Sequence, residues 1–406
     1  MNSGYLEMNY IAENATGRGN NVQVIMEDLH DGTVKVTEGR VGIRIGRNKP
    51  HSFLISSDSW DDYVTGRLKR GYIITKKQRM DKREINKGGF ADIEDENVRD
   101  IVSRLIQYAN ATIAQNYTTT IDDISDEMID KAAEILQDLA KRKDTVSVVE
   151  FNNCLKILFA VIPRRIDNLS KVLAVSKSQI NDILEDEQEL FDLIVSQLRD
   201  NQIRITKQQT ILEAKNMEWR PVTEEEKQHL LKMMGGSSSK YLQAWRVENL
   251  NTRKRFNDFC VKENLSGKDD VVELFHGSRS ENFWSITTNG LTINPSGVVI
   301  TGKMFGNGTY FAPKAQKSIG YTSSYNSRWA NGNQSTGFLA VYDVATGKRF
   351  HPSSSDSSLN YAKLQKMCPG AHCTWATAAS CGLINEEVIV YKDEQSSIKY
   401  LIEFVS

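Results

Sequence analysis

The sequence predicts a multidomain α+β protein. Alternating apolar residues around a glycine turn indicate strands in the first eighty positions, and helical periodicity dominates from about residue 98 to residue 200. Strand and helix signals then mix as far as the last of the 406 residues. A chain of this length is long for one hydrophobic core, so we expect two or three domains.

The composition is that of an intracellular, soluble protein. Lys and Arg number 51 against 52 Asp and Glu, and the formal net charge is −1. No apolar run is long enough to cross a bilayer, and no secretory segment follows Met1. We expect a monomer with no membrane contact, nuclear in a eukaryotic host and cytoplasmic or nucleoid-associated in a bacterial one.

The five cysteines have irregular spacing, which predicts free thiols in a reducing compartment. Cys368 and Cys373 flank His372, but a second ligand pair at zinc-site spacing is missing. We therefore expect a loop here and no metal site.

Charge is distributed unevenly along the chain. Residues 34–90 hold fourteen Lys and Arg against six Asp and Glu, a balance of +8, whereas residues 92–200 hold twelve against twenty-two, a balance of −10. Such asymmetry favours a polyanion partner for the basic part, or docking between the two parts. A solvated surface is the alternative.

The first predicted domain covers residues 21–80, after a polar N-terminus of residues 1–20 that we expect to be disordered. Two strands flank Asp31-Gly32, a typical hairpin turn, and a third is expected at residues 41–45. A helix carrying Trp60 and ending at Gly71 follows, before a last extended segment at Ile73.

Residues 81–97 are charged and aperiodic, and we predict a linker there. Residues 98–200 then form an all-α domain, with apolar stripes at helical spacing and capping residues such as Ser125. Residues 201–406 are predicted as a mixed α/β domain with a helix over residues 224–234. Its expected strands are 242–247, 271–275, 338–344, 385–391 and 398–404.

The segment Gly302–Tyr321 draws attention within the last domain. Gly306 and Gly308 can adopt backbone angles closed to other residues, so a substrate could approach the main chain closely there. A short strand at Tyr310 and a helix over residues 312–321, with Pro313 in its first turn, are expected to follow.

Three elements of this domain are expected to converge. His276 ends one strand, Tyr310 lies on a second and Glu387 begins a third. Glu386 and Glu387 must point to opposite faces of that strand. A carboxylate that enters an apolar sheet needs a compensating role, because burying its charge is costly.

These motifs together closely resemble the catalytic domain of poly(ADP-ribose) polymerases. The resemblance rests on Leu274–Arg279, Gly302–Ala312, Lys317-Ser318 with Tyr321, and Asn385–Tyr391, and it is strong from residue 271 to the C-terminus. It implies a mixed α/β ADP-ribosyltransferase domain with a split antiparallel sheet.

Weaker similarity extends upstream. Glu38–Gly42, Gly46 and Gly71-Tyr72 resemble the WGR domain of the DNA-break-dependent members, although Glu38 replaces the tryptophan that names the domain. The helical region resembles the regulatory domain that precedes the catalytic domain, with its best local match at Leu158–Pro163. The resemblance implies DNA-break binding through cations that contact phosphates. These cations are Arg40, Arg44, Arg47 and Lys49.

The resemblance also implies roles for the site residues with NAD+ as co-substrate and no metal. Glu387 would stabilise positive charge on the ribose as nicotinamide leaves, and His276 would hold the adenosine-side ribose. The Gly277 backbone and the Ser318 hydroxyl would bind the nicotinamide amide, and Tyr310 with Tyr321 would stack on its ring. The full predicted NAD+-binding set is His276, Gly277, Ser278, Tyr310, Lys317, Ser318 and Tyr321.

The expected function is transfer of ADP-ribose from NAD+ to protein acceptors, including the enzyme itself, stimulated by DNA breaks in a DNA damage response. The stretch between Gly347 and Asn385 is shorter than in the nuclear polymerases, which leaves a constitutive mono-ADP-ribosyltransferase as one alternative. A non-catalytic scaffold that binds NAD or nucleic acid is the other.

Overall fold

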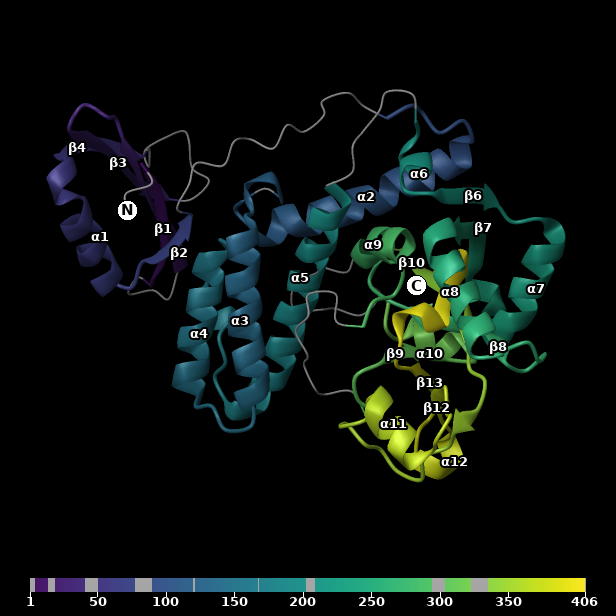
Figure 1. Ribbon diagram of the computed structural model, residues 1–406. Coiled ribbons are helices and arrows are strands. Elements are labelled where there is room, and N and C mark those ends of the chain that lie inside the picture. Colours follow the sequence, from purple (N-terminus) through teal and green to yellow (C-terminus); the bar gives the residue numbers. More distant parts are fainter. Residues whose placement is uncertain are drawn as a thin grey trace. The chain divides into compact units, whose positions relative to one another are not determined.

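The computed structural model describes residues 4–13, 19–40, 50–76, 90–119, 121–166, 168–201, 209–293, 304–322 and 335–405. These residues form two compact units (Figure 1). Unit 1 is built mainly from residues 1–85 and 111–198, and unit 2 from residues 86–110, 199–295 and 301–406.

Unit 1 begins with a five-stranded sheet of order β4-β3-β2-β1-β5. Helix α1 (Trp60–Lys69) covers one face, where Trp60 packs against the apolar side chains of the strands. Gly71, with a φ of 89°, ends the helix as predicted. The strands are β1 (Tyr5–Glu13), β2 (Gly19–Asp28), β3 (Thr33–Arg40), β4 (His51–Ser56) and β5 (Ile73–Lys76).

The prediction of a disordered N-terminus is wrong, because β1 lies inside this sheet between β2 and β5. Leu6 and Met8 point into the core beneath α1. On the opposite face Asn9 is buried and its side-chain amide donates a hydrogen bond of 3.2 Å to the Ala160 carbonyl. Both faces of β1 are thus covered, which no local pattern reveals. The third strand expected at residues 41–45 lies outside the described residues.

The rest of unit 1 is helical. Ser125 and Ser147 cap α3 and α4 with their side chains, and Ser125 does so as predicted. A buried ion pair of 3.3 Å between Arg164 and Glu187 joins the end of α4 to α5. The helices are α3 (Asp126–Arg142), α4 (Val148–Val161) and α5 (Ile180–Asn201), together with the last turns of α2 (Glu96–Asn116).

Helix α2 corrects two predicted boundaries. It begins at Glu96, inside the expected linker, and residues 96–110 of its 21 residues belong to unit 2 rather than to the helical region. Ile101 and Leu105 are fully buried against Trp245 in the core of unit 2. One continuous helix therefore runs from unit 2 into unit 1, since its last turns pack in unit 1.

An ion pair fixes the first half of α2 to the sheet of unit 2. The Arg104 guanidinium donates to both oxygens of Glu403, a carboxylate that is 3% exposed. Gln243 at 2.7 Å and Thr336 at 3.0 Å donate to the same carboxylate. Burial raises the pKa of Glu403, but these hydrogen bonds and the Arg104 charge outweigh burial and leave the pKa below its usual value.

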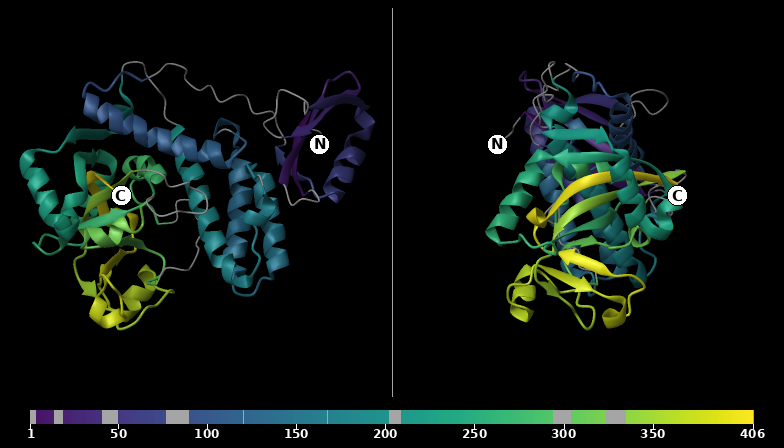
Figure 2. Two further views of the ribbon diagram at one scale, coloured as in Figure 1. Left: turned by 180° about the vertical axis from the view of Figure 1, so that it is seen from behind. Right: turned by 90° about the vertical axis from the view of Figure 1, so that its right-hand side faces the viewer.

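Unit 2 contains two sheets. The larger is antiparallel with order β6-β7-β14-β10-β8, and the smaller has order β11-β12-β13-β9 with one parallel pair, β11–β12. Figure 2 shows the smaller sheet below the larger one in both views. The strands are β6 (Met217–Pro221), β7 (Tyr241–Asn249), β8 (Val271–Gly277), β9 (Thr309–Phe311), β10 (Thr336–Ala345), β11 (Arg349–Phe350), β12 (Cys373–Ala376), β13 (Glu387–Val390) and β14 (Ser396–Val405).

In unit 2, helices pack on both faces of the larger sheet. Leu230 of α7 and Ala315 of α10 lie in one apolar core, and Phe283 of α9 lies in the other with the first half of α2. The α-helices are α6 (Ile211–Ala214), α7 (Glu224–Met234), α8 (Leu250–Lys262), α9 (Phe283–Asn289), α10 (Ala315–Ile319), α11 (Tyr361–Met367) and α12 (Ala378–Cys381). The 3-10 helices among the described residues of both units are η1 (Ser57–Ser59), η2 (Ile121–Asp123), η3 (Leu169–Lys171), η4 (Lys177–Gln179), η5 (Gly235–Lys240), η6 (Ser280–Asn282) and η7 (Asp393–Gln395).

The predicted mixed α/β fold with antiparallel sheets is confirmed for unit 2, and α7 has the predicted bounds. The helix expected over residues 312–321 is shorter, because Ala312 still bridges to Phe275 and Pro313 precedes the helix rather than opening it. None of the helices in the described ranges is both long and apolar enough to cross a membrane.

We expect Arg104→Met to lower the free energy of unfolding by about 2–3 kcal/mol near neutral pH, because Glu403 stays buried without its cation. A carboxyl with a depressed pKa stabilises the folded state above its usual pKa of 4.5 and loses that contribution as the pH falls. The deficit of the variant should therefore shrink below that pH. Urea unfolding of the protein and the variant, near neutral pH and again below pH 4.5, measures this difference in the free energy of unfolding.

Asp100→Asn is the matched control for this prediction. Asp100 also pairs with Arg104, at 3.4 Å, but its side chain is 63% exposed, so its loss should cost less than about 0.5 kcal/mol. Equal effects of the two substitutions would show that the buried pair does not fix α2 to the sheet.

Candidate active site

The two sheets of unit 2 meet where β8 ends. An isolated bridge between Phe275 and Ala312 joins β8 to the segment after β9, with hydrogen bonds of 2.9 Å in both directions. The next side chain, His276, uses its Nδ1 to bind the Tyr310 carbonyl at 2.9 Å. Because a carbonyl oxygen only accepts, Nδ1 carries the proton, and the imidazole is held against β9.

Tyr310 closes the glycine turn before β9. Its hydroxyl donates to the Gly306 carbonyl at 2.9 Å and accepts from the Phe305 N–H at 2.9 Å. Burial raises the pKa of Tyr310 well above its usual value, so the phenol remains neutral. The hydroxyl thus fixes the turn, and the ring of Tyr310 is the part that remains for stacking.

The two glycines of the turn allow contact with the protein's own backbone. Gly306 has a φ of 71°, and a Cβ on it would lie 1.9 Å from the Leu359 carbonyl oxygen. A Cβ on Gly308 would lie 2.6 Å from the Val390 carbonyl oxygen. Leu359 and β13 thus approach these glycines closely and hold the turn in place.

Glu387 begins β13 and is 6% exposed. On one side of β13, Glu387 pairs with Ala376 of β12. On the other side, the pairing with β9 begins at the next residue, Val388. Lys317 of α10 approaches the Glu387 carboxylate, with 2.6 Å between Nζ and Oε1. Glu386 points the other way, as predicted, and accepts a hydrogen bond of 2.9 Å from the Trp375 indole.

Lys317 links Glu387 to Tyr321. Its Nζ lies 5.3 Å from the centre of the Tyr321 ring, which is 59% exposed. Burial lowers the pKa of Lys317, but hydrogen bonds to Glu387 and Tyr321 outweigh burial and raise the pKa above its usual value. The ammonium is therefore charged at neutral pH and balances the buried carboxylate.

Ser318 and Gly277 lie against each other at the end of β8. Ser318 is 3% exposed and its hydroxyl donates to the Phe275 carbonyl at 3.3 Å. A Cβ on Gly277 would lie 1.9 Å from the Ser318 carbonyl oxygen, so only glycine fits there. Sequence reasoning missed Asn282, whose amide donates to the Ser278 hydroxyl at 3.1 Å, because it follows the motif in a 3-10 helix.

The structure therefore brings the predicted site residues to one region of unit 2, where β8, β9, α10 and β13 meet (Figure 1). His276, Tyr310, Ser318 and Glu387 are at least partly buried, whereas Tyr321 is exposed. A buried carboxylate paired with a lysine, next to aromatic rings, can stabilise positive charge that develops on a bound group.

One of the four predicted DNA-binding residues lies among the described residues of unit 1. Arg40 is exposed at the end of β3, and the others, Arg44, Arg47 and Lys49, lie outside the described residues. Glu38 is not a free negative charge, because Arg67 and the Tyr63 hydroxyl both donate to its carboxylate. This pairing neutralises a carboxylate that would otherwise repel phosphate.

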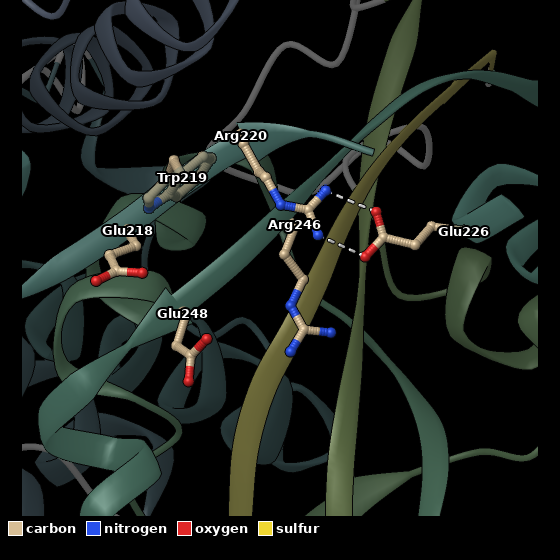
Figure 3. A pocket seen from close by; sticks show the side chains of 6 residues that line it. All are labelled: Glu218, Trp219, Arg220, Glu226, Arg246 and Glu248. Atoms are coloured by element: carbon tan, nitrogen blue, oxygen red, sulfur yellow. Dashed lines mark hydrogen bonds and ion pairs between the residues drawn. The ribbon is translucent and has the colours of Figure 1, made fainter. Parts of the chain in front are cut away.

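A pocket of about 460 Å³ lies elsewhere in unit 2 and contains none of the predicted site residues (Figure 3). As for metals, no group of three or more His, Cys, Asp or Glu side chains within the described ranges is arranged to hold an ion.

The sequence profile of the poly(ADP-ribose) polymerase catalytic domain matches residues 223–406. The poly [ADP-ribose] polymerase-like protein 100L of Invertebrate iridescent virus 6 is 32% identical over 170 residues, which are 40% of this chain and 86% of the viral protein. Poly [ADP-ribose] polymerase 2 of Homo sapiens is 32% identical over 155 residues, 32% of this chain and 26% of the human protein.

Poly [ADP-ribose] polymerase 1 of Gallus gallus is 27% identical over 185 residues, which are 40% of this chain and 17% of the chicken protein. The matched segment thus spans most of the viral relative and about a quarter or less of the two vertebrate ones.

We expect Tyr310→Phe to lower the free energy of unfolding by about 1–2 kcal/mol, because the Phe305 N–H and the Gly306 carbonyl lose their partner. Hydrogen exchange at the Phe305 amide should accelerate in the variant. Tyr342→Phe is the matched control, since the Tyr342 hydroxyl is buried with no hydrogen-bond partner in the described part of the chain. The Tyr342→Phe substitution should leave the free energy of unfolding unchanged or raise it. An equal loss of stability in both variants would contradict the role of the Tyr310 hydroxyl in the turn.

Proposed function

The chain belongs to the poly(ADP-ribose) polymerase family and is an NAD+ ADP-ribosyltransferase, and from this premise we propose that it transfers ADP-ribose to protein acceptors, including itself. The observation that supports this proposal most is the buried Glu387 carboxylate, held by Lys317 beside the Tyr310 turn.

Glu387 would act on the nicotinamide-side ribose of NAD+. The bond from the ribose C1′ to the nicotinamide nitrogen breaks, its electron pair leaves with nicotinamide, and positive charge develops on the ribose. A carboxylate hydrogen-bonded to the 2′-hydroxyl stabilises that charge, and such electrostatic help is typically worth roughly 10²–10³ in rate. As the acceptor oxygen bonds to C1′, Glu387 can position it or take its proton.

Lys317 would hold this carboxylate in a fixed orientation. Its side chain is held between Glu387 and the Tyr321 ring, so it contributes a fixed charge rather than a mobile one. The ion pair also lowers the cost of burying Glu387 before NAD+ arrives.

The remaining residues would hold NAD+ in place. His276 and Ser278 would bind the adenosine-side ribose, and the Tyr310 and Tyr321 rings would stack on nicotinamide. The Ser318 hydroxyl already donates to Phe275, so it would accept a hydrogen bond from the nicotinamide amide rather than donate one. Gly277 would contribute its backbone, which the contact with Ser318 holds in place.

The short stretch between Gly347 and Asn385 favours a second candidate for the product. In this segment only β11, α11, β12 and α12 separate the larger sheet from Glu387. Less chain is therefore present to bind a growing polymer, which favours transfer of a single unit. Labelled product that runs as a ladder on a gel indicates polymer, and one shifted band indicates mono-ADP-ribosylation.

We also propose that DNA breaks stimulate the enzyme through unit 1. The basic balance of residues 34–90, the exposed Arg40 and the neutralised Glu38 support binding to a polyanion. These features would place the enzyme in a DNA damage response.

We expect Glu387→Gln to reduce kcat about 10²–10³-fold while NAD+ still binds, because glutamine keeps the shape but loses the charge. Glu386→Gln is the matched control, since this neighbour faces the opposite side of the strand and binds Trp375. It should retain activity. Nicotinamide release from labelled NAD+ measures both variants, and a fully active Glu387→Gln would rule out the assigned role.

Nicked duplex DNA should increase NAD+ consumption by the full chain, and Arg40→Gln should weaken that stimulation without changing the basal rate. The stimulation should also fall steeply with added salt, because phosphate contacts release counterions. Lys35→Gln serves as the control on the opposite face of β3. A rate that nicked DNA leaves unchanged would favour a constitutive enzyme.

A further inference from the structure

The pocket in Figure 3 lies on one face of the edge strand β6 and its neighbour β7, away from the candidate active site. Antiparallel register pairs Glu218 with Glu248 and Arg220 with Arg246. Two like-charged pairs thus face each other across the strands, an arrangement that destabilises a sheet unless other charges compensate. The pairs are about 7 Å apart along the strands, since a strand rises about 3.4 Å per residue.

Part of this charge is already balanced within the protein. Arg220 binds Glu226 of α7 through two hydrogen bonds of 2.7 and 2.8 Å. Its guanidinium lowers the pKa of Glu226 to about 2, so this pair is ionised at neutral pH. Glu248 lies 3.8 Å from Arg253 of α8. Arg253 also pairs with Asp343, at 2.8 Å. Glu226 therefore has a cation of its own, and Glu248 shares one.

Arg246 and Glu218 are left without such partners. Figure 3 shows no dashed line from the Arg246 guanidinium to any of the three carboxylates, and within the described residues neither side chain has an ion-pair partner within 4 Å. Arg246 instead lies over the Tyr400 ring, 5.1 Å from its centre, which holds the guanidinium in the pocket. Arg246 adds to the lowering of the Glu226 pKa, so its charge is partly balanced. Arg246 and Glu218 are nevertheless the two charged side chains of the pocket that form no ion pair within the described residues.

We propose that this pocket binds a small zwitterion of the amino acid or dipeptide class, with its carboxylate on Arg246 and its ammonium on Glu218. The planar guanidinium matches a carboxylate through two parallel hydrogen bonds. A volume of about 460 Å³ is ample for such a molecule. Inorganic phosphate is a poorer fit, because three glutamates surround the single available arginine and repel a dianion.

The test is isothermal titration of the full chain with three related probes and phosphate. Glycylglycine carries both charges, acetylglycylglycine only the negative one and glycylglycinamide only the positive one. We expect glycylglycine to bind roughly tenfold or more tightly than either blocked probe or phosphate, because each of those loses one charge pairing or meets repulsion.

Two variants locate the binding. Arg246→Gln should abolish the preference for glycylglycine over glycylglycinamide, and Glu218→Gln should abolish the preference over acetylglycylglycine. Both should leave NAD+ turnover unchanged, which shows that unit 2 remains folded. The proposal is overturned if glycylglycine does not bind, if phosphate or a blocked probe binds as tightly, or if either variant keeps the full set of preferences.

Discussion

The ion pair between Lys317 and Glu387 is the interaction on which the rest of the site depends. Glu387 begins a strand whose other residues are all buried, and an ionised carboxylate there is costly without a partner. Lys317 supplies that partner from α10, at 2.6 Å. Helix α10 can place Lys317 there only because Gly277 lets the end of β8 contact Ser318, the residue that follows Lys317. Backbone packing and side-chain chemistry are thus coupled: the contact that needs a glycine also sets the position of the charge.

The same region is tied to the remainder of the chain through the larger sheet. His276 ends β8, which pairs with β10, and β10 pairs with β14. Glu403 on β14 holds Arg104, on a helix whose far end packs in unit 1. A displacement of α2 would therefore act on β14, which is separated from β8 in the sheet only by β10.

Much of unit 2 could be predicted from sequence because its signals are local. The bounds of α7 follow from a threonine cap, and the orientation of Glu386 and Glu387 follows from strand alternation. The ion pairs of Lys317 with Glu387 and of Arg104 with Glu403 could not be predicted from sequence, because they depend on how elements far apart in the chain pack together. β1 was missed for another reason: Leu6, Met8 and Tyr10 do alternate with polar residues, but Glu7 and Asn9 are themselves buried, and composition alone suggested disorder.

A complex of the full chain with a non-hydrolysable NAD+ analogue tests the central claim most directly. The account predicts the Glu387 carboxylate at about 2.6–3.2 Å from the 2′-hydroxyl of the nicotinamide-side ribose, with Lys317 still paired to it. An analogue bound with its ribose out of reach of Glu387, or with nicotinamide away from Tyr310, would contradict it.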